Sequence, residues 1–173
     1  MGDPAGPAPP TPQQAAVGWV EAVMDRSDLR AAWPLTDPRL RLVLAQDWIW
    51  AHRHHPFVGH GADWDALARA LAAARPDHHL WARFSAELLE LWQKMWKGFN
   101  ARTWGPRDGP EVIDLDLEMV TFVEVGGAPG SDRDAFARRF AMRHGPDGWR
   151  VASIHGDQLF APGWPPSLES SSG

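Results

Sequence analysis

Two titratable residues near the end of the chain, His155 and Asp157, are the first candidates for proton transfer. Alternating residues share a face of a β-strand, so His155 points inward if Trp149 and Val151 do. A histidine that titrates near neutral pH inside an apolar cavity can move a proton to or from carbon or oxygen, and Asp157 could orient its ring. We therefore predict His155 as the catalytic acid or base. The simpler alternative is a histidine that only hydrogen-bonds a backbone carbonyl at the end of the strand.

Asp47 and His52 form a second candidate set. Trp48 and His52 lie four residues apart, a spacing that places both side chains on one face of a helix. Asp47 is a carboxylate beside this apolar face, where it could act on a bound molecule. We include Asp47 among the catalytic candidates and predict Trp48 and His52 as ligand contacts. The alternative is that Asp47 lies on the solvent side of the helix.

The chain contains 11 Trp and no Tyr. A tryptophan usually packs in a core with one partner for its N–H group, and so many in a small protein indicate either a thick core or an aromatic-lined cavity. For a cavity, we expect five further ligand contacts: Trp92, Trp96, Met119, Phe140 and Trp149. Ordinary core packing is the alternative for each of them. Because Tyr is absent, no phenol can act as an acid or an oxyanion donor.

Four histidines crowd one segment that contains a proline and a glycine: His52, His54, His55 and His60. Zinc sites use His pairs, but usually on a rigid element and with a third ligand supplied from elsewhere. This segment has no Cys, and its nearby acids are Asp63 and Asp65. We therefore expect a solvated loop here, and we predict neither a metal nor an organic cofactor.

Three carboxylates alternate along one predicted strand: Asp114, Asp116 and Glu118. They could line a polar cavity for a cationic ligand. The alternative, which we favour, is a water-facing side of the sheet or a contact with arginines of the neighbouring strand.

Composition sets the broad class of the protein. With 173 residues and 44% hydrophobic content, one domain with a real core is expected, and we place it over residues 13–164. Residues 1–12 and 165–173 are predicted to be disordered because Pro, Gly, Ala and Ser dominate them. The net charge of −5 argues against a nucleic-acid partner. The chain shows no membrane-spanning stretch, no signal-peptide pattern and no Cys, so we expect a soluble cytoplasmic protein.

The elements that must position these residues are predicted as helices first and a sheet last. Apolar residues at three- and four-residue spacing predict helices over residues 13–26, 40–51, 64–74 and 78–99. Ser27 and Asp28 are candidate N-caps of a short helix over residues 29–33, and Thr36-Asp37-Pro38 predicts a new helix start with Pro at the first helical position. Alternation predicts an antiparallel meander with strands over residues 112–125, 135–144 and 149–155, and a turn at residues 145–148. We expect the longest helix to lie across the concave, apolar side of this sheet, which carries Leu117 and Met119.

This layout resembles the nuclear transport factor 2-like superfamily, in which N-terminal helices close a curved antiparallel sheet. Residues 17–33 (VGWVEAVMDRSDLRAAW) and the TDP that follows resemble the opening helices of that superfamily, and residues 148–155 (GWRVASIH) resemble its closing strand. The resemblance covers residues 13–160 and implies a cone-like α+β fold with a pocket between helices and sheet. Residues 63–99 depart from the pattern, because two helices are predicted where members usually have a strand or hairpin.

The resemblance also implies a set of functions: SnoaL-like polyketide cyclases, steroid isomerases, epoxide hydrolases, dehydratases and non-catalytic ligand binders. The steroid-isomerase type needs a Tyr and is excluded here. The epoxide-hydrolase type needs two Asp and an Arg, and no motif selects among the candidates Asp47, Asp114, Asp116, Asp157, Arg139 and Arg143.

We therefore expect a SnoaL-like pocket protein whose partner is a hydrophobic small molecule. If it is an enzyme, it is a cofactor-free cyclase, isomerase or dehydratase that works by general acid–base catalysis. A homodimer is implied by the resemblance alone. The alternative is a non-catalytic ligand-binding or dimeric interaction domain.

Overall fold

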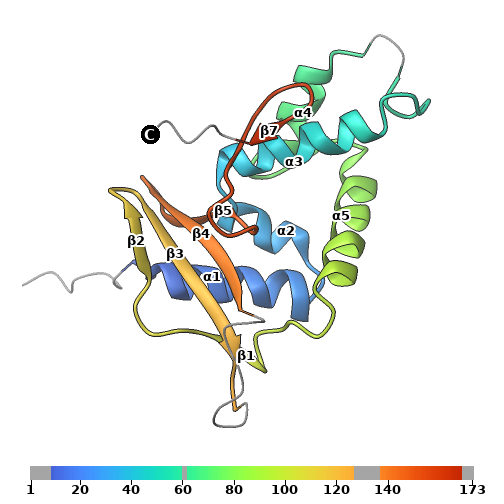
Figure 1. The fold of residues 1–173 in the computed structure, drawn as a ribbon. Coiled ribbons are helices and arrows are strands. Elements are labelled where there is room, and N and C mark those ends of the chain that lie inside the picture. The colour runs from blue at the N-terminus through green and yellow to red at the C-terminus, as the bar shows by residue number, and fades with distance from the viewer. Residues whose placement is uncertain (1–8, 60–61, 127–136, 169–173) are drawn as a thin grey trace, which may run out of the picture.

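The computed structural model describes residues 9–59, 62–126 and 137–168, which form an α+β fold with an antiparallel sheet (Figure 1). The predicted fold class is confirmed at this level. Residues 1–8 and 169–173, for which disorder was predicted, lie outside the described residues. His60 and residues 135–136, the start of a predicted strand, lie outside them as well.

The N-terminal part is helical, and polar side chains cap the starts of four helices. Thr11, Asp28, Asp37 and Asp63 each accept a hydrogen bond from a backbone N–H group in the first turn. The α-helices are α1 (Pro12–Val20), α2 (Leu29–Ala32), α3 (Pro38–Ala51), α4 (Trp64–Ala72) and α5 (Trp81–Met95). Two short turns accompany them: a π-helical turn (Glu21–Asp25) continues α1, and a 3₁₀ turn (Trp33–Leu35) follows α2. Short-range capping chemistry therefore determined where most of these helices begin.

The main sheet contains five strands in the order β1-β3-β4-β5, and β2 also pairs with β3. The strands are β1 (Trp104–Pro106), β2 (Glu111–Asp114), β3 (Leu117–Glu124), β4 (Arg138–Gly145) and β5 (Gly148–Ser153). The predicted turn between the last two strands is present, and Gly148 supplies its positive φ of 96°. A separate pair, β6 (Phe160–Ala161) and β7 (Ser167–Leu168), follows. Residues 165–168 thus form part of an ordered hairpin, although the sequence placed them in a disordered tail.

The first predicted strand, over residues 112–125, is in fact a hairpin. Leu115 and Asp116 form a tight turn, and β2 folds back on β3 so that Val112 lies opposite Glu118. The prediction of one long strand was wrong because a two-residue turn leaves the alternating pattern unbroken. The turn is fully solvent-exposed at Leu115, and β2 is exposed along its whole length.

The face of the sheet that meets the helices is also opposite to the predicted one. Val120 and Phe122 of β3 join the main core under the helices, whereas Leu117 and Met119 form a small cluster on the other face with Ala141 and Ala152. Leu159 of the C-terminal segment covers that small cluster. Both faces of β3 are therefore buried, so hydrophobicity alone could not identify the helical side.

The helix that lies across the sheet is α1, not α5. It packs against β1, β3, β4 and β5, whereas α5 stands beside the bundle (Figure 1). Phe84 of α5 packs on Trp33 and Trp48 from the neighbouring helical segments. The contacts with Phe140 of the sheet come from Trp96 and Phe99, which follow α5. The expectation that the longest helix roofs the sheet was wrong. Its apolar stripe covers other helices, and a stripe does not identify its partner.

The space between α1 and the sheet is filled by aromatic rings. Phe140 is fully buried, with its ring 5.7 Å from those of Trp19 and Trp96 and 5.4 Å from that of Phe122. The indole N–H of Trp19 donates to the Thr36 hydroxyl at 2.9 Å, so this core leaves no unpaired indole there. Trp19 and Trp96 therefore belong to a solid core between α1 and the sheet.

Candidate functional site

A pocket of about 380 Å³ lies where α3 and α5 meet the C-terminal segment. One face of α3 supplies residues three or four positions apart, α5 supplies the second wall, and residues after β5 supply the third. The lining side chains are Leu40, Val43, Leu44, Asp47, Trp48, Ala51 and His52 from α3 and its C-cap, Glu87, Leu88, Leu91, Trp92 and Met95 from α5, and Ile154, His155, Phe160 and Pro166. The wall is mostly apolar, with four titratable groups.

The C-terminal segment is held in place over this pocket by contacts with α3 and α4. The backbone N–H of Gly163 donates to the Gln46 side chain at 3.0 Å. The indole N–H of Trp164 donates to Asp65 at 2.9 Å, and its ring lies 5.6 Å from that of Trp64. These bonds fix the strand pair that brings Phe160 and Pro166 to the pocket.

Glu87 joins the two helices at the edge of the pocket. Its carboxylate accepts hydrogen bonds from the indole N–H of Trp48 at 2.8 Å and from Arg83 at 2.8 Å, and His52 Nε2 lies 3.1 Å away. The guanidinium of Arg83 stacks over the Phe57 ring at 3.9 Å. Burial by itself would raise the pKa of Glu87, but the bonds from Trp48 and Arg83 and the nearby His52 outweigh it, and the pKa is lowered. Glu87 is therefore an ionised structural carboxylate.

His52 has both ring nitrogens engaged. Nδ1 lies 2.8 Å from the backbone oxygen of Trp48, and Nε2 faces the Glu87 carboxylate. Both ring nitrogens of His52 therefore have partners within the protein. His52 consequently has no free nitrogen to offer a molecule in the pocket.

His155 reaches the pocket by a route that the sequence did not predict. An extra residue, Ala152, makes a bulge in β5, so that Val151 lies opposite Met142 and Ser153 lies opposite Ala141 on the other face. The strand ends at Ser153, and His155 follows in a bend. The predicted link between the directions of Val151 and His155 was wrong, because the bulge interrupts the alternation.

The His155 ring is free to interact with a bound molecule. The residue is exposed overall, but its side chain borders the pocket, and its ring lies 6.3 Å from that of Phe160. Among the described residues, none hydrogen-bonds either ring nitrogen. Partial burial lowers the pKa of His155, so the imidazole is neutral near neutral pH. A neutral imidazole with free nitrogens can accept a proton.

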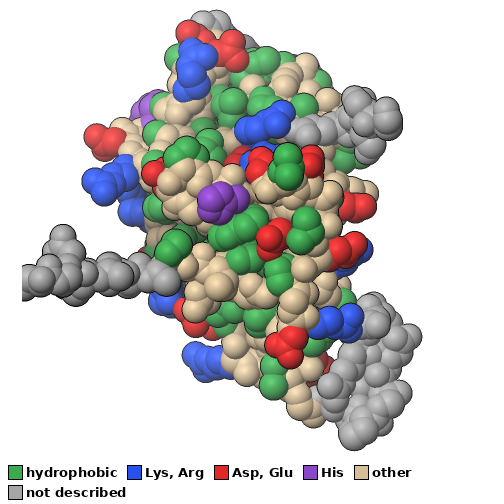
Figure 2. Space-filling model, turned by 90° about the vertical axis from the view of Figure 1, so that its left-hand side faces the viewer, with side chains coloured by type: hydrophobic (Ala, Val, Ile, Leu, Met, Phe, Trp, Pro, Cys, Tyr) green, Lys and Arg blue, Asp and Glu red, His purple; other side chains and the backbone are tan. Residues whose placement is uncertain are grey.

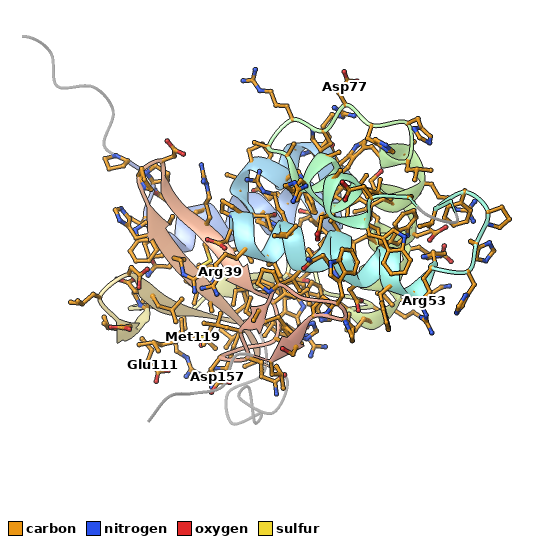
Figure 3. All side chains as sticks on the ribbon, turned by 90° about the horizontal axis from the view of Figure 1, so that it is seen from above. Arg39, Arg53, Asp77, Glu111, Met119 and Asp157 are labelled. Atoms are coloured by element: carbon orange, nitrogen blue, oxygen red, sulfur yellow. The ribbon has the colours of Figure 1, made fainter. Side chains whose placement is uncertain are left out.

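Asp157 does not orient His155. It is exposed, and no hydrogen bond or ion pair joins it to His155 in the described part of the chain. In the view of Figure 3, Asp157 lies at the same margin of the molecule as Glu111, away from the helices. Asp47, by contrast, lines the pocket next to Trp48 and is exposed to solvent.

Four of the predicted ligand contacts lie elsewhere. Trp96 and Phe140 belong to the solid core between α1 and the sheet. Met119 lies on the opposite face of the sheet, and Trp149 packs against His144 with ring centres 4.9 Å apart. The pocket therefore brings together Asp47, Trp48, His52, Trp92 and His155 from the predicted set.

Glu87 is the residue that sequence reasoning missed. A signal existed, because Glu87 lies three residues after Phe84 and four before Leu91, at the edge of the predicted apolar stripe of α5. A carboxylate at that position is suited to accept the N–H of a buried tryptophan from a neighbouring helix. What the spacing could not supply was the identity of that tryptophan.

No group of three or more His, Asp or Glu side chains within residues 9–59, 62–126 and 137–168 is arranged to hold a metal ion. No helix in that part of the chain has the length and apolarity that crossing a bilayer requires. No family model, curated protein or solved structure matches the chain.

Proposed function

We propose that this protein binds a small, largely hydrophobic molecule in the pocket between α3, α5 and the C-terminal segment. The observation that carries the proposal is the wall itself: apolar side chains from three separate segments enclose about 380 Å³. This volume falls within the range of small-molecule sites, roughly 300–1,000 Å³. Each Å² of apolar ligand surface removed from water contributes roughly 25 cal/mol.

The resemblance to the nuclear transport factor 2-like superfamily supports the same proposal. It implies a ligand pocket between helices and sheet, and His155, which borders the present pocket, lies just after β5 of the sheet. The position differs from a cone interior, because aromatic rings fill the space between α1 and the sheet. On the face shown in Figure 2, basic and acidic side chains are interspersed, which supports a small-molecule partner over a nucleic acid.

General acid–base catalysis on the bound molecule is the enzymatic form of this proposal. His155 is the group that would accept a proton from carbon or oxygen and return it, as a cyclisation, an isomerisation or a dehydration requires. Its free nitrogens and lowered pKa support this role, whereas both nitrogens of His52 are occupied. No metal or organic cofactor takes part in this proposed reaction.

Non-catalytic binding is the second candidate function. One observation favours it: no described residue holds the His155 ring in a fixed orientation. A catalytic base is usually oriented by a partner, as in the triads of hydrolases.

Calorimetric titration with octan-1-ol tests the binding proposal. Ala51 is exposed and lines the pocket, so Ala51→Trp should place an indole in its mouth and reduce the affinity at least several-fold. Ala82→Trp, at an exposed position of α5 outside the lining, is the matched control and should bind like the unchanged protein. Absence of octan-1-ol binding to the unchanged protein, or equal binding by Ala51→Trp, would contradict the proposal.

Deuterium exchange distinguishes the catalytic form from the non-catalytic one. Phenylacetone has acidic protons next to its carbonyl, and their exchange in heavy water can be followed by proton NMR. Catalysis predicts that the protein accelerates the exchange and that His155→Gln abolishes the acceleration. His144→Gln, outside the pocket, should retain it. Binding of phenylacetone without accelerated exchange would support the non-catalytic function.

A further inference from the structure

The charges around the pocket indicate which head group its ligand carries, and this inference rests on the proposed function. We propose that the ligand is an amphiphile with a cationic amine head, which the Asp47 carboxylate binds while the apolar body lies between α3 and α5.

The described lining residues include no Lys or Arg. Arg83 contacts the lining residue Glu87, but its guanidinium is already bonded to that carboxylate and stacked over Phe57. His155 is neutral at neutral pH because burial lowers its pKa. A ligand carboxylate or phosphate would therefore find no unpaired cation in this wall and would meet two carboxylates, Asp47 and Glu87.

The two carboxylates differ in their partners. Glu87 is bonded to Trp48 and Arg83 and pairs with His52, so its charge is already balanced. Asp47 has no hydrogen bond or ion pair with any described residue. It is thus the unpaired charge of the pocket, and a cation is the group that complements it.

The rest of the wall suits the body of such a molecule. The neighbours of Asp47 on the same face of α3 are Val43, Leu44 and Ala51, all of which line the pocket. Leu91 and Met95 of α5 border the same space and are 56% and 44% exposed. An alkyl or aromatic chain that covers these two side chains removes their apolar surface from water, and an amine at its end can stay near Asp47 and the solvent.

Calorimetry with octylamine, octan-1-ol and octanoate tests the inference, because the three probes share one tail and differ only in the head. Near neutral pH the alkyl amine is protonated, as a lysine side chain is. We expect octylamine to bind about two- to five-fold more tightly than octan-1-ol, the gain of an exposed ion pair, and octanoate to bind most weakly. Added salt should reduce the amine preference.

Two variants locate the effect. Asp47→Asn should remove the preference for octylamine, so that the ratio of the octylamine and octan-1-ol affinities falls to about one. Asp77→Asn makes the same change of net charge in the loop before α5, away from the pocket, and should retain the preference (Figure 3). Both positions are exposed, so both variants should fold.

The outcomes separate this inference from the proposed function. If octan-1-ol binds as tightly as octylamine, or if Asp47→Asn keeps the preference, the cationic head is refuted while the apolar pocket stands. If octanoate binds most tightly, the ligand class is anionic and the inference is refuted. If none of the three probes binds, the proposed function fails as well.

Discussion

The indole N–H of Trp48 on α3 donates a 2.8 Å hydrogen bond to the carboxylate of Glu87 on α5. The two residues are 39 positions apart in the sequence, and their bond fixes the corner in which the pocket lies. The same carboxylate also meets His52 and Arg83, so one side chain connects the C-terminal end of α3 to the first half of α5.

Glu87→Ala should therefore lower the free energy of unfolding by about 1–3 kcal/mol, because the buried N–H of Trp48 loses its acceptor. Urea titration of the variant measures this loss. Glu90→Ala is the control: Glu90 pairs with Lys94 on the solvent side of the same helix, and its loss should cost less than about 0.5 kcal/mol. Equal losses for the two variants would show that Glu87 has no special role.

The stability of the protein should fall in acid partly because of Glu87. Its pKa in the folded protein lies below the ordinary value of 4.5, so the folded state binds the proton less tightly than the unfolded chain does. The stabilisation is complete above that ordinary value and is lost as the pH falls through the lowered folded value. Urea midpoints measured from about pH 6 down to about pH 3 should fall less for Glu87→Gln than for the unchanged protein. Identical slopes would refute this contribution.

Phe140→Leu should affect stability and not ligand binding. Phe140 is fully buried among Trp19, Trp96 and Phe122, away from the pocket, so a smaller side chain leaves a gap in the core. We expect a loss of roughly 1–3 kcal/mol in the free energy of unfolding, with the affinity for octan-1-ol unchanged. Leu44→Ala, in the pocket wall, should weaken octan-1-ol binding instead. If Phe140→Leu weakened octan-1-ol binding without lowering the free energy of unfolding, Phe140 would be a ligand contact after all.

Arg41→Met should leave stability unchanged or raise it. Arg41 is only 6% exposed, and its Nε is buried without a hydrogen-bond partner. Burial, and then the nearby Arg150, lower its pKa, while Asp37 opposes them. Asp37 keeps Arg143 as a partner at 3.4 Å when Arg41 is replaced. A buried charge with an unsatisfied polar atom carries a desolvation penalty, so an apolar side chain of similar length removes that penalty.

Thermal or urea unfolding of Arg41→Met measures this effect, and Arg41→Lys is the comparison variant that keeps the positive charge. The lysine keeps the charge in a more strongly hydrated form, so it should be less stable than the unchanged protein. A large loss of stability in Arg41→Met would show that the guanidinium makes a net favourable contribution where it lies.

The sequence by itself determined the features that depend on a few neighbouring residues. Asp28 and Asp37 cap α2 and α3 because a short side-chain oxygen reaches the free N–H groups of the first turn. Gly148 takes the positive φ that the turn between β4 and β5 requires. Helical and alternating periodicities also separated a helical first part from an antiparallel last part, and hence predicted the α+β class.

The tertiary structure alone decided the features that depend on which faces meet. Leu115 and Asp116 turn the chain without changing the alternation, so the pattern could not reveal the hairpin. Ala152 adds one residue to β5 and so breaks the link between Val151 and His155.

The pocket could not be predicted from the sequence for the same reason. Glu87 acquires its role from Trp48, and only packing brings these residues from different helices together. Periodicity reports that a side chain is buried, whereas its partner is selected by the shapes and hydrogen-bonding needs of the whole core.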